Sequence, residues 1–545
     1  MLKRLMFVLN SGVLVISLMA CASQPAESVE LASVQVTAVP PTMVNDQLPI
    51  ANSPTPILTS TPTPAPSATA TPTPTASPTA TPTPDPPIIV AAAAEWETAV
   101  TTALAELTTE QQPWQFHRSD DPTADLAAGL AHVAVSHDPE GALIFQEPLA
   151  LAIPFTTNWQ FITLADAQAI LENGHQIVIV LPWHEMTPDL KALHVNGIRP
   201  NQPEYPLQTQ LTLTAVPGME TAVSQLLPLL QTALQPASVI QITAVGDIMM
   251  DRGLGYNLRQ GYLTYPFAKV AHLFHAADIT VGNVESALGT GGEPMPKAYP
   301  FRAPPEAAEA LALAGFDVVS LANNHGMDYG EETLLEGIEL LKAAGVQPIG
   351  AGANRAEART PYITEANGLT VAFLGYVNVP VEARSAFDVR TWDATETSPG
   401  LAWGEPDVVT EDVTAVRPQV DLVVVVLHSG FEYVEEPSEP QAAIARAAID
   451  AGADIVIGHH AHILQGIEFY NGGVIVYGLG NFAFEIDGDP STAILNVWLD
   501  ANGVREIELI PAIIQFGGQP RLIEAWESFP ALERVYYLTK ILNGR

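Results

Sequence analysis

The sequence of 545 residues contains only one cysteine, Cys21. A single thiol cannot form a disulfide within the chain, so the fold is not held together by a disulfide framework. Because this cysteine lies near the N-terminus, thiolate is also excluded as a catalytic nucleophile or metal ligand in the rest of the chain. Any metal site must therefore use nitrogen and oxygen ligands.

Basic residues are also scarce. The chain has 22 Lys and Arg residues against 60 Asp and Glu residues, which gives a formal net charge of −38 and a pI of about 4.4. Nucleic-acid binding depends on Lys and Arg side chains that neutralise phosphates, so we expect no nucleic-acid partner. A solvated extracellular surface accounts for the acidity, and a polyanionic ligand would need locally basic or metal-bridged contacts.

The first 21 residues resemble a bacterial lipoprotein signal peptide. Lys3 and Arg4 give a positive start, the segment from Leu5 to Met19 is mostly apolar, and residues 18–21 (Leu-Met-Ala-Cys) resemble a lipobox. We therefore expect lipidation of Cys21 after cleavage and an extracytoplasmic protein that its lipid anchors to the cell membrane. The alternative is a plain transmembrane anchor, for which the apolar run is short of the roughly 20 residues that a span needs.

Residues 22–90 are predicted to form a disordered linker rich in Pro, Thr and Ser. From about Ser53 to Pro87 the sequence consists of Thr-Pro repeats with Ala and Ser. Proline fixes φ and removes a hydrogen-bond donor, so this segment cannot bury a core and favours an extended spacer of roughly 3 Å per residue. Together with Cys21 it predicts a tether that holds the folded domains away from the membrane.

Residues 91–237 are predicted to form a small α/β domain. The expected elements are a helix over Glu95–Leu107, a strand over Leu149–Ile153, a helix over Thr163–Asn173 with a Thr cap, and a strand over Gln176–Leu181. Residues 148–174 faintly resemble one lobe of a periplasmic solute-binding protein. The alternative is a spacer domain or a packing partner for the domain that follows.

Residues 238–545 alternate between strand and helix patterns, which predicts a larger α/β domain. Helical spacing of apolar residues occurs over Pro304–Ala314, Glu331–Ala344 and Ala442–Ala451, and later strands such as Val474–Tyr477 and Ala493–Trp498 follow one another closely. Alternation followed by strand pairs fits two sheets flanked by helices.

Five apolar runs in this region end in polar side chains. In α/β sheets, ligands gather at the carboxyl ends of strands, so the repeated pattern predicts one shared site. Histidine, carboxylate and amide groups in such a cluster are typical metal ligands. Taken singly, a His after a strand, an Asp that caps a helix and an Asn-Asn turn each have a structural explanation. The runs end at Asp247, at Asn283 and Glu285, at Asn323–His325, at His428 and at Gly458–His462.

Six ordered motifs resemble the CapA family, over about residues 239–515. That family is associated with poly-γ-glutamate capsule synthesis, and its fold is related to the calcineurin-like metallophosphoesterases. The resemblance implies an αββα two-sheet sandwich of metallophosphoesterase type. The motifs are Gly246–Arg252, Gly282–Ser286, Ser320–Gly330, His428–Tyr433, Gly458–His462 and Tyr477–Phe482.

The resemblance also implies roles for particular residues. Asn324 matches a metal ligand and His325 a candidate acid for the leaving group. Asp247 matches the aspartate of the first strand, but Met249 stands where a further His ligand is usual. Glu285 is the likelier ligand of the second motif, with Asn283 as the other candidate. The remaining ligand matches are His428, His460 and His462, and His459 is an additional His whose role is open.

These residues predict a site for one or two divalent ions, held by Asp247, Glu285, Asn324, His428, His460 and His462. Mixed nitrogen and oxygen ligands suit manganese, iron or zinc better than magnesium or calcium. Such an ion lowers the pKa of a bound water toward about 7 and supplies hydroxide at neutral pH. Arg252 or His325 would steady an oxyanion.

Three functions fit the sequence. The first is a tethered metal-dependent hydrolase that acts on a phosphoester or on an amide of an anionic cell-surface polymer. The second is a non-catalytic component of a membrane assembly that synthesises or exports the polymer, with its synthesis and export proteins as partners. The third is a solute-binding lipoprotein. Met249 at a usual ligand position favours the second, and the density of ligand-type residues favours the first.

Overall fold

The computed structural model describes residues 85–234, 237–382, 386–486, 488–523 and 530–544. The lipobox cysteine Cys21 and the Thr-Pro repeats up to Pro84 lie outside the described residues, so the predicted lipid anchor and tether stay predictions. The described chain is a mixed α/β protein with several sheets, as the sequence predicts. Among the described residues, no helix combines the length and apolar character that crossing a bilayer requires.

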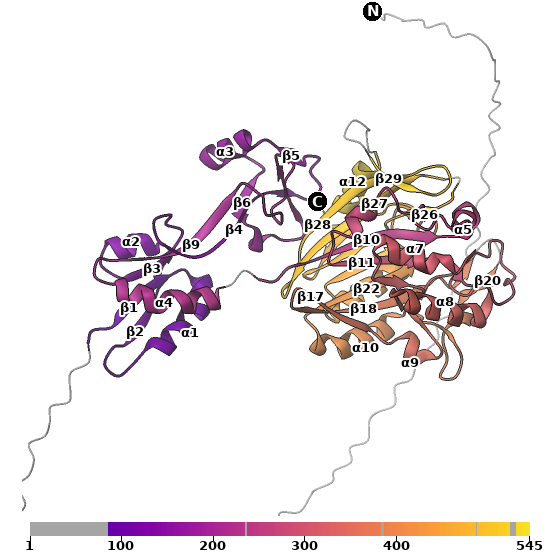
Figure 1. Ribbon diagram of the computed structural model, residues 1–545, viewed down its shortest axis with the longest axis horizontal. Coiled ribbons are helices and arrows are strands. Elements are labelled where there is room, and N and C mark those ends of the chain that lie inside the picture. The colour runs from indigo at the N-terminus through magenta and orange to yellow at the C-terminus, as the bar shows by residue number, and fades with distance from the viewer. Residues whose placement is uncertain (1–84, 235–236, 383–385, 487, 524–529, 545) are drawn as a thin grey trace, which may run out of the picture. The chain divides into compact units, whose positions relative to one another are not determined.

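Two large sheets form the C-terminal region (Figure 1). The first has eight strands in the order β15 (Gln347–Ile349), β14 (Val318–Ser320), β11 (Ile279–Val284), β10 (Ile240–Met249), β27 (Ser491–Asp500), β28 (Gly503–Ile514) and β29 (Pro520–Leu522), with β26 (Asn481–Phe484) paired to β10. The second has six strands in the order β17 (Tyr362–Ala366), β18 (Leu369–Asn378), β22 (Leu422–Ser429), β23 (Ile455–His459), β25 (Gly473–Val476) and β24 (Ile467–Tyr470).

Helices and short ladders complete this region. The helices are α5 (Arg252–Arg259), α6 (Ala271–Phe274), α7 (Glu306–Ala314), α8 (Gly330–Ala344), α9 (Arg355–Ala358), α10 (Pro406–Val416), α11 (Glu439–Asp450) and α12 (Pro530–Leu542), with 3-10 turns η3 (Val389–Trp392) and η4 (Arg417–Gln419). The two-stranded ladders are β12 (Ala287–Leu288) with β13 (Arg302–Ala303), β16 (Ala351–Gly352) with β21 (Gly400–Leu401), and β19 (Val381–Glu382) with β20 (Phe387–Asp388).

Three apolar cores explain why these strands are apolar on both faces. One core contains residues of both large sheets, including Ile242 and Val281 from the first and Val424 and Ile457 from the second. A second core packs the other face of the first sheet against α7 and α8. A third packs the other face of the second sheet against α10 and α11. Because both faces are covered, strands such as β22 are buried along their whole length.

The helices and strands follow the predicted pattern closely. The helices expected over Pro304–Ala314 and Glu331–Ala344 are α7 and α8, and the one expected over Ala442–Ala451 is α11. This last helix begins earlier than predicted, because Ser438 and Gln441 form a capping box at its start. Alternation of apolar residues alone does not reveal such a cap.

Gly246 in β10 allows two strands to approach closely beside Asp247. A Cβ atom at this position would lie 2.0 Å from the carbonyl oxygen of Gly480, which accepts a hydrogen bond from Asp247 N at 2.9 Å. The contact places the start of β26 next to the end of β10. Only a residue without a side chain fits there.

We expect Gly246→Ala to lower the free energy of unfolding by about 2–3 kcal/mol, because the added methyl group must displace backbone rather than a flexible side chain. The matched control is Gly488→Ala, whose Cβ would meet only Tyr433 Cε1 at 3.9 Å. That change should alter the free energy of unfolding by less than about 0.5 kcal/mol. Guanidinium titration of the two variants measures both values, and equal effects would contradict the role of the close approach.

Residues 88–234 form a separate seven-stranded sheet. Its order is β2 (Trp114–Arg118), β1 (Ile88–Ala92), β3 (Val133–Ser136), β9 (Gln208–Ala215), β4 (Ala142–Pro154) and β6 (Ile179–Pro182), with β7 (Leu190–Ala192) paired to β4. β5 (Phe161–Ile162) pairs with β8 (His194–Val195). The helices are α1 (Glu97–Leu107), α2 (Pro122–Ala127), α3 (Leu164–Asn173) and α4 (Glu220–Ala233), with 3-10 turns η1 (Ala94–Trp96) and η2 (Trp183–Glu185).

This region differs from the prediction in three details. β1 begins at Ile88, inside the segment assigned to the linker, because the register of β1 pairs Ile88 with Trp114 of β2. The strand expected over Gln176–Leu181 begins only at Ile179, where pairing with β4 starts. The helix expected over Glu95–Leu107 is a 3-10 turn up to Trp96 and α-helical from Glu97. Separate apolar cores lie around α1 and α4 and around α3. The helix α3 has the predicted Thr163 cap and ends before Gly174.

Two glutamates of β28, the buried Glu506 and the largely buried Glu508, receive side chains from residues 183–199. Arg199 contacts Glu506 at 3.0 Å and Glu508 at 2.6 Å, and Trp183 Nε1 donates to Glu506 Oε2 at 2.9 Å. His194 Nε2 lies 3.1 Å from Glu508 Oε1. This polar cluster, which we call the Glu506–Glu508 contact, fits the alternative that the smaller region is a packing partner of the larger one.

The Glu506–Glu508 contact predicts a dependence of stability on pH. Burial alone would raise the pKa of Glu508, but Arg199 and His194 lower it to about 2 from a usual value of 4.5. A carboxyl group with a lowered pKa in the folded state stabilises the fold above its usual pKa, and this contribution is lost as the pH falls. We expect wild type to be more stable than Glu508→Gln above pH 4.5, and the difference to shrink as the pH falls toward 2.

Urea titrations of wild type and Glu508→Gln through that pH window measure the difference directly. Other carboxyl groups titrate in the same window, but their contribution is common to both proteins and cancels in the comparison. A difference in free energy of unfolding that stays constant with pH would contradict the lowered pKa.

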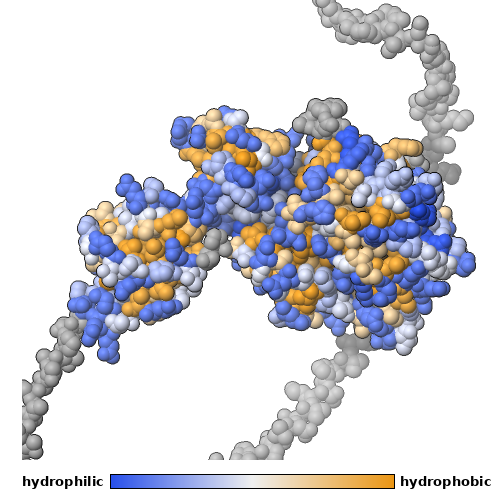
Figure 2. Space-filling model, viewed as in Figure 1, coloured by the Kyte–Doolittle hydropathy of each residue, from blue (hydrophilic) through white to orange (hydrophobic). Residues whose placement is uncertain are grey.

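The face of the molecule shown in Figure 2 is a mixture of hydrophilic residues and apolar patches. Exposed apolar side chains around β5 and β6 include Phe161, Ile177 and Ile179, which are 57%, 46% and 50% exposed. The hydrophilic residues fit the expectation of a solvated surface that follows from the net charge.

Candidate metal centre

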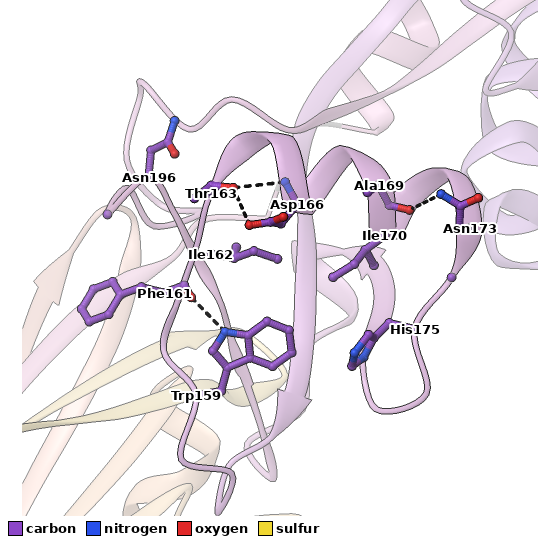
Figure 3. Close-up of a pocket in the computed structure, with 12 residues that line it drawn as sticks. Trp159, Phe161, Ile162, Thr163, Asp166, Ala169, Ile170, Asn173, His175 and Asn196 are labelled. Atoms are coloured by element: carbon purple, nitrogen blue, oxygen red, sulfur yellow. Dashed lines mark hydrogen bonds between the residues drawn. The ribbon is translucent and has the colours of Figure 1, made fainter.

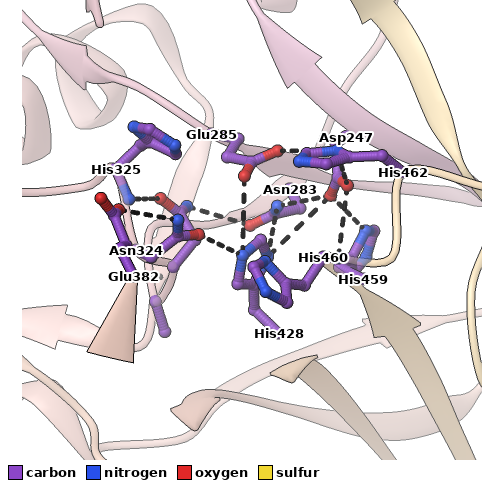
Figure 4. Close-up of polar contacts among 12 residues, drawn as sticks. Asp247, Asn283, Glu285, Asn324, His325, Glu382, His428, His459, His460 and His462 are labelled. Atoms are coloured by element: carbon purple, nitrogen blue, oxygen red, sulfur yellow. Dashed lines mark hydrogen bonds and ion pairs between the residues drawn. The ribbon is translucent and has the colours of Figure 1, made fainter. Parts of the chain in front are cut away.

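The predicted ligands meet at the carboxyl ends of parallel strands from both large sheets. β10, β11 and β14 are parallel in the first sheet, and β22 and β23 are parallel in the second. Their ends bring Asp247, Glu285, His428, His460 and His462 together (Figure 4). All five side chains are buried. Strand order therefore explains how residues more than 200 positions apart come to share one site.

Glu285, His428 and His460 form one group of side chains that could hold an ion. Their ligand atoms all lie within 4.8 Å of one another. His428 Nε2 lies 3.6 Å from Glu285 Oε1 and 2.6 Å from Asn324 Oδ1. The predicted ligand Asn324 thus presents its amide oxygen to the same group.

Asp247, Glu285 and His462 form a second group, whose ligand atoms also lie within 4.8 Å of one another. His462 Nδ1 lies 3.4 Å from Asp247 Oδ2 and 3.8 Å from Glu285 Oε2. Glu285 belongs to both groups and presents one oxygen to each (Figure 4). The arrangement has the form of two ion positions that share a carboxylate.

Unpartnered polar atoms support this interpretation. Both carboxylate oxygens of Glu285 and the Nδ1 atom of His460 are buried, and none of them has a hydrogen-bond partner among the described residues. A buried carboxylate without a partner costs several kcal/mol, which a cation would offset. The donor set of carboxylate, amide oxygen and imidazole suits a divalent metal.

The two carboxyl groups of the site differ in their pKa. Burial and repulsion from Asp247 raise the pKa of Glu285 well above its usual value. Burial would also raise the pKa of Asp247, but hydrogen bonds from His459 and His462 hold it well below its usual value. Asp247 is therefore the more strongly anionic group, and Glu285 is the group whose ionised form most needs an added positive charge.

The three imidazoles are also distinct. Burial and the neighbouring His460 lower the pKa of His428, and burial and His462 lower the pKa of His460 to about 3, so both rings are neutral and keep a lone pair for an ion. Burial would lower the pKa of His462, but Glu285 and Asp247 raise it to about 10. The group of Asp247, Glu285 and His462 therefore stabilises positive charge, because its two carboxyl groups favour the protonated form of His462.

Asn283 and His459 hold Asp247 in place. Asn283 Nδ2 donates to Asp247 Oδ1 at 2.8 Å, and its own oxygen accepts from Asn323 at 3.1 Å. His459 Nδ1 lies 3.0 Å from Asp247 Oδ1. Contacts of this kind are typical of residues that orient a metal ligand. The Nε2 atom of His459 is buried and has no hydrogen-bond partner among the described residues.

Met249 packs away from the ligand groups. Its sulfur accepts a hydrogen bond from Asp251 N at 3.3 Å, and its side chain belongs to an apolar cluster with Phe301 and Phe484. The position that usually carries a His ligand therefore faces hydrophobic residues in this chain.

His325 belongs to a buried charged network that the sequence motifs did not predict. Its Nδ1 atom lies 2.6 Å from Asp328 Oδ2, so Nε2 is the ring nitrogen that takes no part in this contact. Lys297 contacts Asp328, and it lies 2.6 Å from Glu382. Asp328 lies three residues after His325 within the motif Ser320–Gly330, so that spacing could have identified it. Lys297 and Glu382 come from segments without a motif.

A pocket of about 240 Å³ opens beside His325 and His462, and Arg252 lines it. The guanidinium of Arg252 lies 5.0 Å from the ring centre of Phe301 and donates to the carbonyl oxygen of Glu485 at 3.3 Å. Among the described residues, no carboxylate lies within ion-pair distance of Arg252. Positive φ angles occur at Arg252, Tyr433, His460 and His462, and backbone of this kind is often concentrated at functional sites.

The amino-acid sequence matches a known protein family. The family described as "Bacterial capsule synthesis protein PGA_cap" matches residues 241–486. The capsule biosynthesis protein CapA of Bacillus anthracis is 33% identical over 312 residues, which cover 55% of this chain and 73% of that protein. The chain belongs to the CapA family. This confirms the resemblance predicted from the six motifs, and the CapA family is part of the metallophosphoesterase-like superfamily.

Two further proteins are similar to this CapA-family chain. The PGA biosynthesis protein CapA of Bacillus subtilis (strain 168) is 32% identical over 278 residues, covering 50% of this chain and 71% of that protein. A crystal structure of a hypothetical protein from Thermus thermophilus is 14% identical with a TM-score of 0.33, covering 50% of this chain and 98% of that chain.

The CapA-family chain also has a larger cavity, of about 740 Å³, between β5 and α3 (Figure 3). Trp159, Phe161 and His175 line it with aromatic rings. Its polar side chains bond locally: Thr163 caps α3, and Asn173 donates to the carbonyl oxygen of Ala169. The cavity thus offers mainly apolar surface. The metal centre, by contrast, contains polar atoms without hydrogen-bond partners among the described residues.

Proposed function

We propose that this chain takes part in the synthesis or export of poly-γ-glutamate or a similar capsule-type polymer, as a lipid-anchored extracytoplasmic protein. Membership of the CapA family and the names of its relatives support the process. The lipobox at Cys21 supports the anchor. Its partners in this proposal are the membrane, the polymer synthesis and export proteins, and the anionic polymer itself.

We further propose that the C-terminal region is an αββα sandwich of metallophosphoesterase type with a hydrolytic two-ion centre. The observation that carries this proposal is Glu285, whose two oxygens have no hydrogen-bond partner among the described residues and belong to two ligand groups. One position would use Glu285, Asn324, His428 and His460, and the other would use Asp247, Glu285 and His462. Divalent manganese, iron or zinc supplies Lewis acidity and a nucleophile at neutral pH in such centres.

The remaining residues have roles in proton transfer and binding. Asp328 accepts the Nδ1 hydrogen and so orients the His325 ring, and in this proposal the protonated ring donates its Nε2 hydrogen to the leaving group. Lys297 balances the charge of Asp328. Arg252 lines the pocket as a cation without a carboxylate partner among the described residues and suits an anionic group, either a phosphoester or the carboxylate of a γ-linked glutamate polymer.

The full chain, stripped and reloaded with manganese, iron or zinc, tests this function. We expect hydrolysis of an aryl phosphodiester or of γ-linked glutamate oligomers. His325→Asn should lower kcat by roughly 10²–10⁴-fold while the metal content stays unchanged. Reloaded protein that retains its ions but hydrolyses neither substrate class would overturn the hydrolase assignment.

A second candidate is a non-catalytic role in the same polymer assembly. Met249 favours it, because this Met stands where the resemblance to the family implies a further His ligand, and its side chain packs with Phe301 and Phe484. In that case the ions would be structural, and replacing His325 would change neither metal content nor polymer production in cells. The two candidates are separated by the effect of His325→Asn on polymer production.

A further inference from the structure

Asn481 is buried at the start of β26 and lies next to Asp247 in the strand register. It also lines the pocket beside His462. Its Oδ1 atom lies 2.9 Å from His462 Nδ1. Asn481 lies within the motif Tyr477–Phe482, and the sequence alone does not predict a role for it.

We propose that Asn481 is a metal ligand at the ion position of Asp247 and His462, and that its amide oxygen takes the place of the side chain that Met249 does not provide. This inference rests on the proposed metal centre and adds a residue to it.

The hydrogen-bond inventory around His462 supports the assignment. Three oxygens approach its Nδ1 atom: Asn481 Oδ1 at 2.9 Å, Asp247 Oδ2 at 3.4 Å and Glu285 Oε2 at 3.8 Å. A ring nitrogen carries at most one hydrogen, so it cannot satisfy three acceptors. The surplus of acceptors around one point is the arrangement that a cation requires.

The spacing of these atoms also fits a coordination shell. Nitrogen and oxygen ligands lie about 2.0–2.2 Å from a first-row divalent ion, so neighbouring ligands in an octahedron or tetrahedron are about 3–3.5 Å apart. The separations of His462 Nδ1 from Asn481 Oδ1 and Asp247 Oδ2, 2.9 and 3.4 Å, are close to that range. Modest side-chain movement would bring all of these atoms onto one ion.

The proposed ligand changes the character of this ion position. With Asn481 it offers three oxygens and one imidazole, whereas the position of His428 and His460 offers two oxygens and two imidazoles. Oxygen-rich sites favour harder ions. We therefore expect the Asn481 position to prefer manganese over zinc, relative to its neighbour.

The test measures the number of ions bound by the metal-free full chain, with manganese as the probe, by calorimetric titration and elemental analysis. We expect two ions in wild type and one in Asn481→Leu. Asn481→Asp, which restores an oxygen ligand, should bind two again. The matched control, Asn502→Leu in the exposed turn between β27 and β28, should also bind two.

Unfolding of the metal-free variants checks that each is folded, and Asn481→Asp keeps the proposal testable if Asn481→Leu is not. Two ions bound to Asn481→Leu with unchanged affinity would overturn the role of Asn481 and leave the metal centre intact. Failure of wild type to bind any ion would instead overturn the metal centre and this proposal with it.

Discussion

Glu285→Gln is expected to abolish the binding of both ions, with a loss of affinity well above the roughly 10–100-fold typical for residues around a metal ligand. Glu285 is the one residue that both ligand groups contain. The amide keeps the size of the side chain but presents one oxygen and no charge. Elemental analysis of the full chain after reloading with manganese, iron or zinc measures the loss.

The stability of the metal-free variant should move in the other direction. Metal-free wild type buries a carboxyl group whose two oxygens have no hydrogen-bond partner among the described residues. Burial and repulsion from Asp247 disfavour its ionised form, and a neutral amide avoids that cost, so metal-free Glu285→Gln should unfold at a temperature no lower than metal-free wild type. Loss of metal can thus be distinguished from loss of structure.

Glu468→Gln is the matched control, because Glu468 is also buried but pairs with Arg446 at 2.7 Å and accepts from Tyr477. It should retain the metal content of wild type. Near-stoichiometric metal in Glu285→Gln would show that the two ligand groups do not depend on this carboxylate, and it would remove the observation on which the proposed function depends.

Arg199→Met is expected to lower the free energy of unfolding by about 3–5 kcal/mol. The change removes the guanidinium that contacts both glutamates of the Glu506–Glu508 contact and leaves the buried carboxylate of Glu506 and the largely buried one of Glu508 without that cation. Methionine keeps most of the side-chain volume, so the effect reports charge rather than a cavity. Arg199 also lies 3.9 Å from the ring centre of Trp498, so tryptophan fluorescence during denaturant titration reports this region.

Arg390→Met provides the comparison on the surface. Arg390 pairs with Asp388 at 2.8 Å, but the two side chains are 57% and 42% exposed. An exposed ion pair contributes little to stability because water screens it, so this variant should be close to wild type. Replacing Glu506 and Glu508 by Gln in the Arg199→Met background should recover part of the loss, since it removes the unpaired charges. Equal stability of Arg199→Met and Arg390→Met would contradict a structural role for the contact.

The sequence predicted those parts of the fold and site that depend on local pattern. The apolar run before Asp247 identified β10, and the Thr163 cap and Gly174 defined both ends of α3. The polar residues after strands identified the candidate ligands, because parallel strands that point the same way end at the same edge.

Other features depend on which distant segments become neighbours, and no local pattern contains that information. Asn481 reaches the site only because β26 pairs with β10. Lys297 reaches His325 from a loop, and Arg199 meets β28 from more than 300 residues away. From the sequence alone, charged residues of this kind are expected to lie on the surface, and their burial becomes evident only when their partners are known.

The shared carboxylate of Glu285 has a consequence for how the protein would respond to metal supply. An ion at one position withdraws negative charge from the oxygen that faces the other, and it also fixes the side chain that both use. The affinities of the two positions would therefore be linked, and linkage is reciprocal: whatever the first ion does to the second, the second does to the first. As the ion concentration rises, the centre would then fill in two steps, with a form that holds one ion between the empty centre and the centre that holds two.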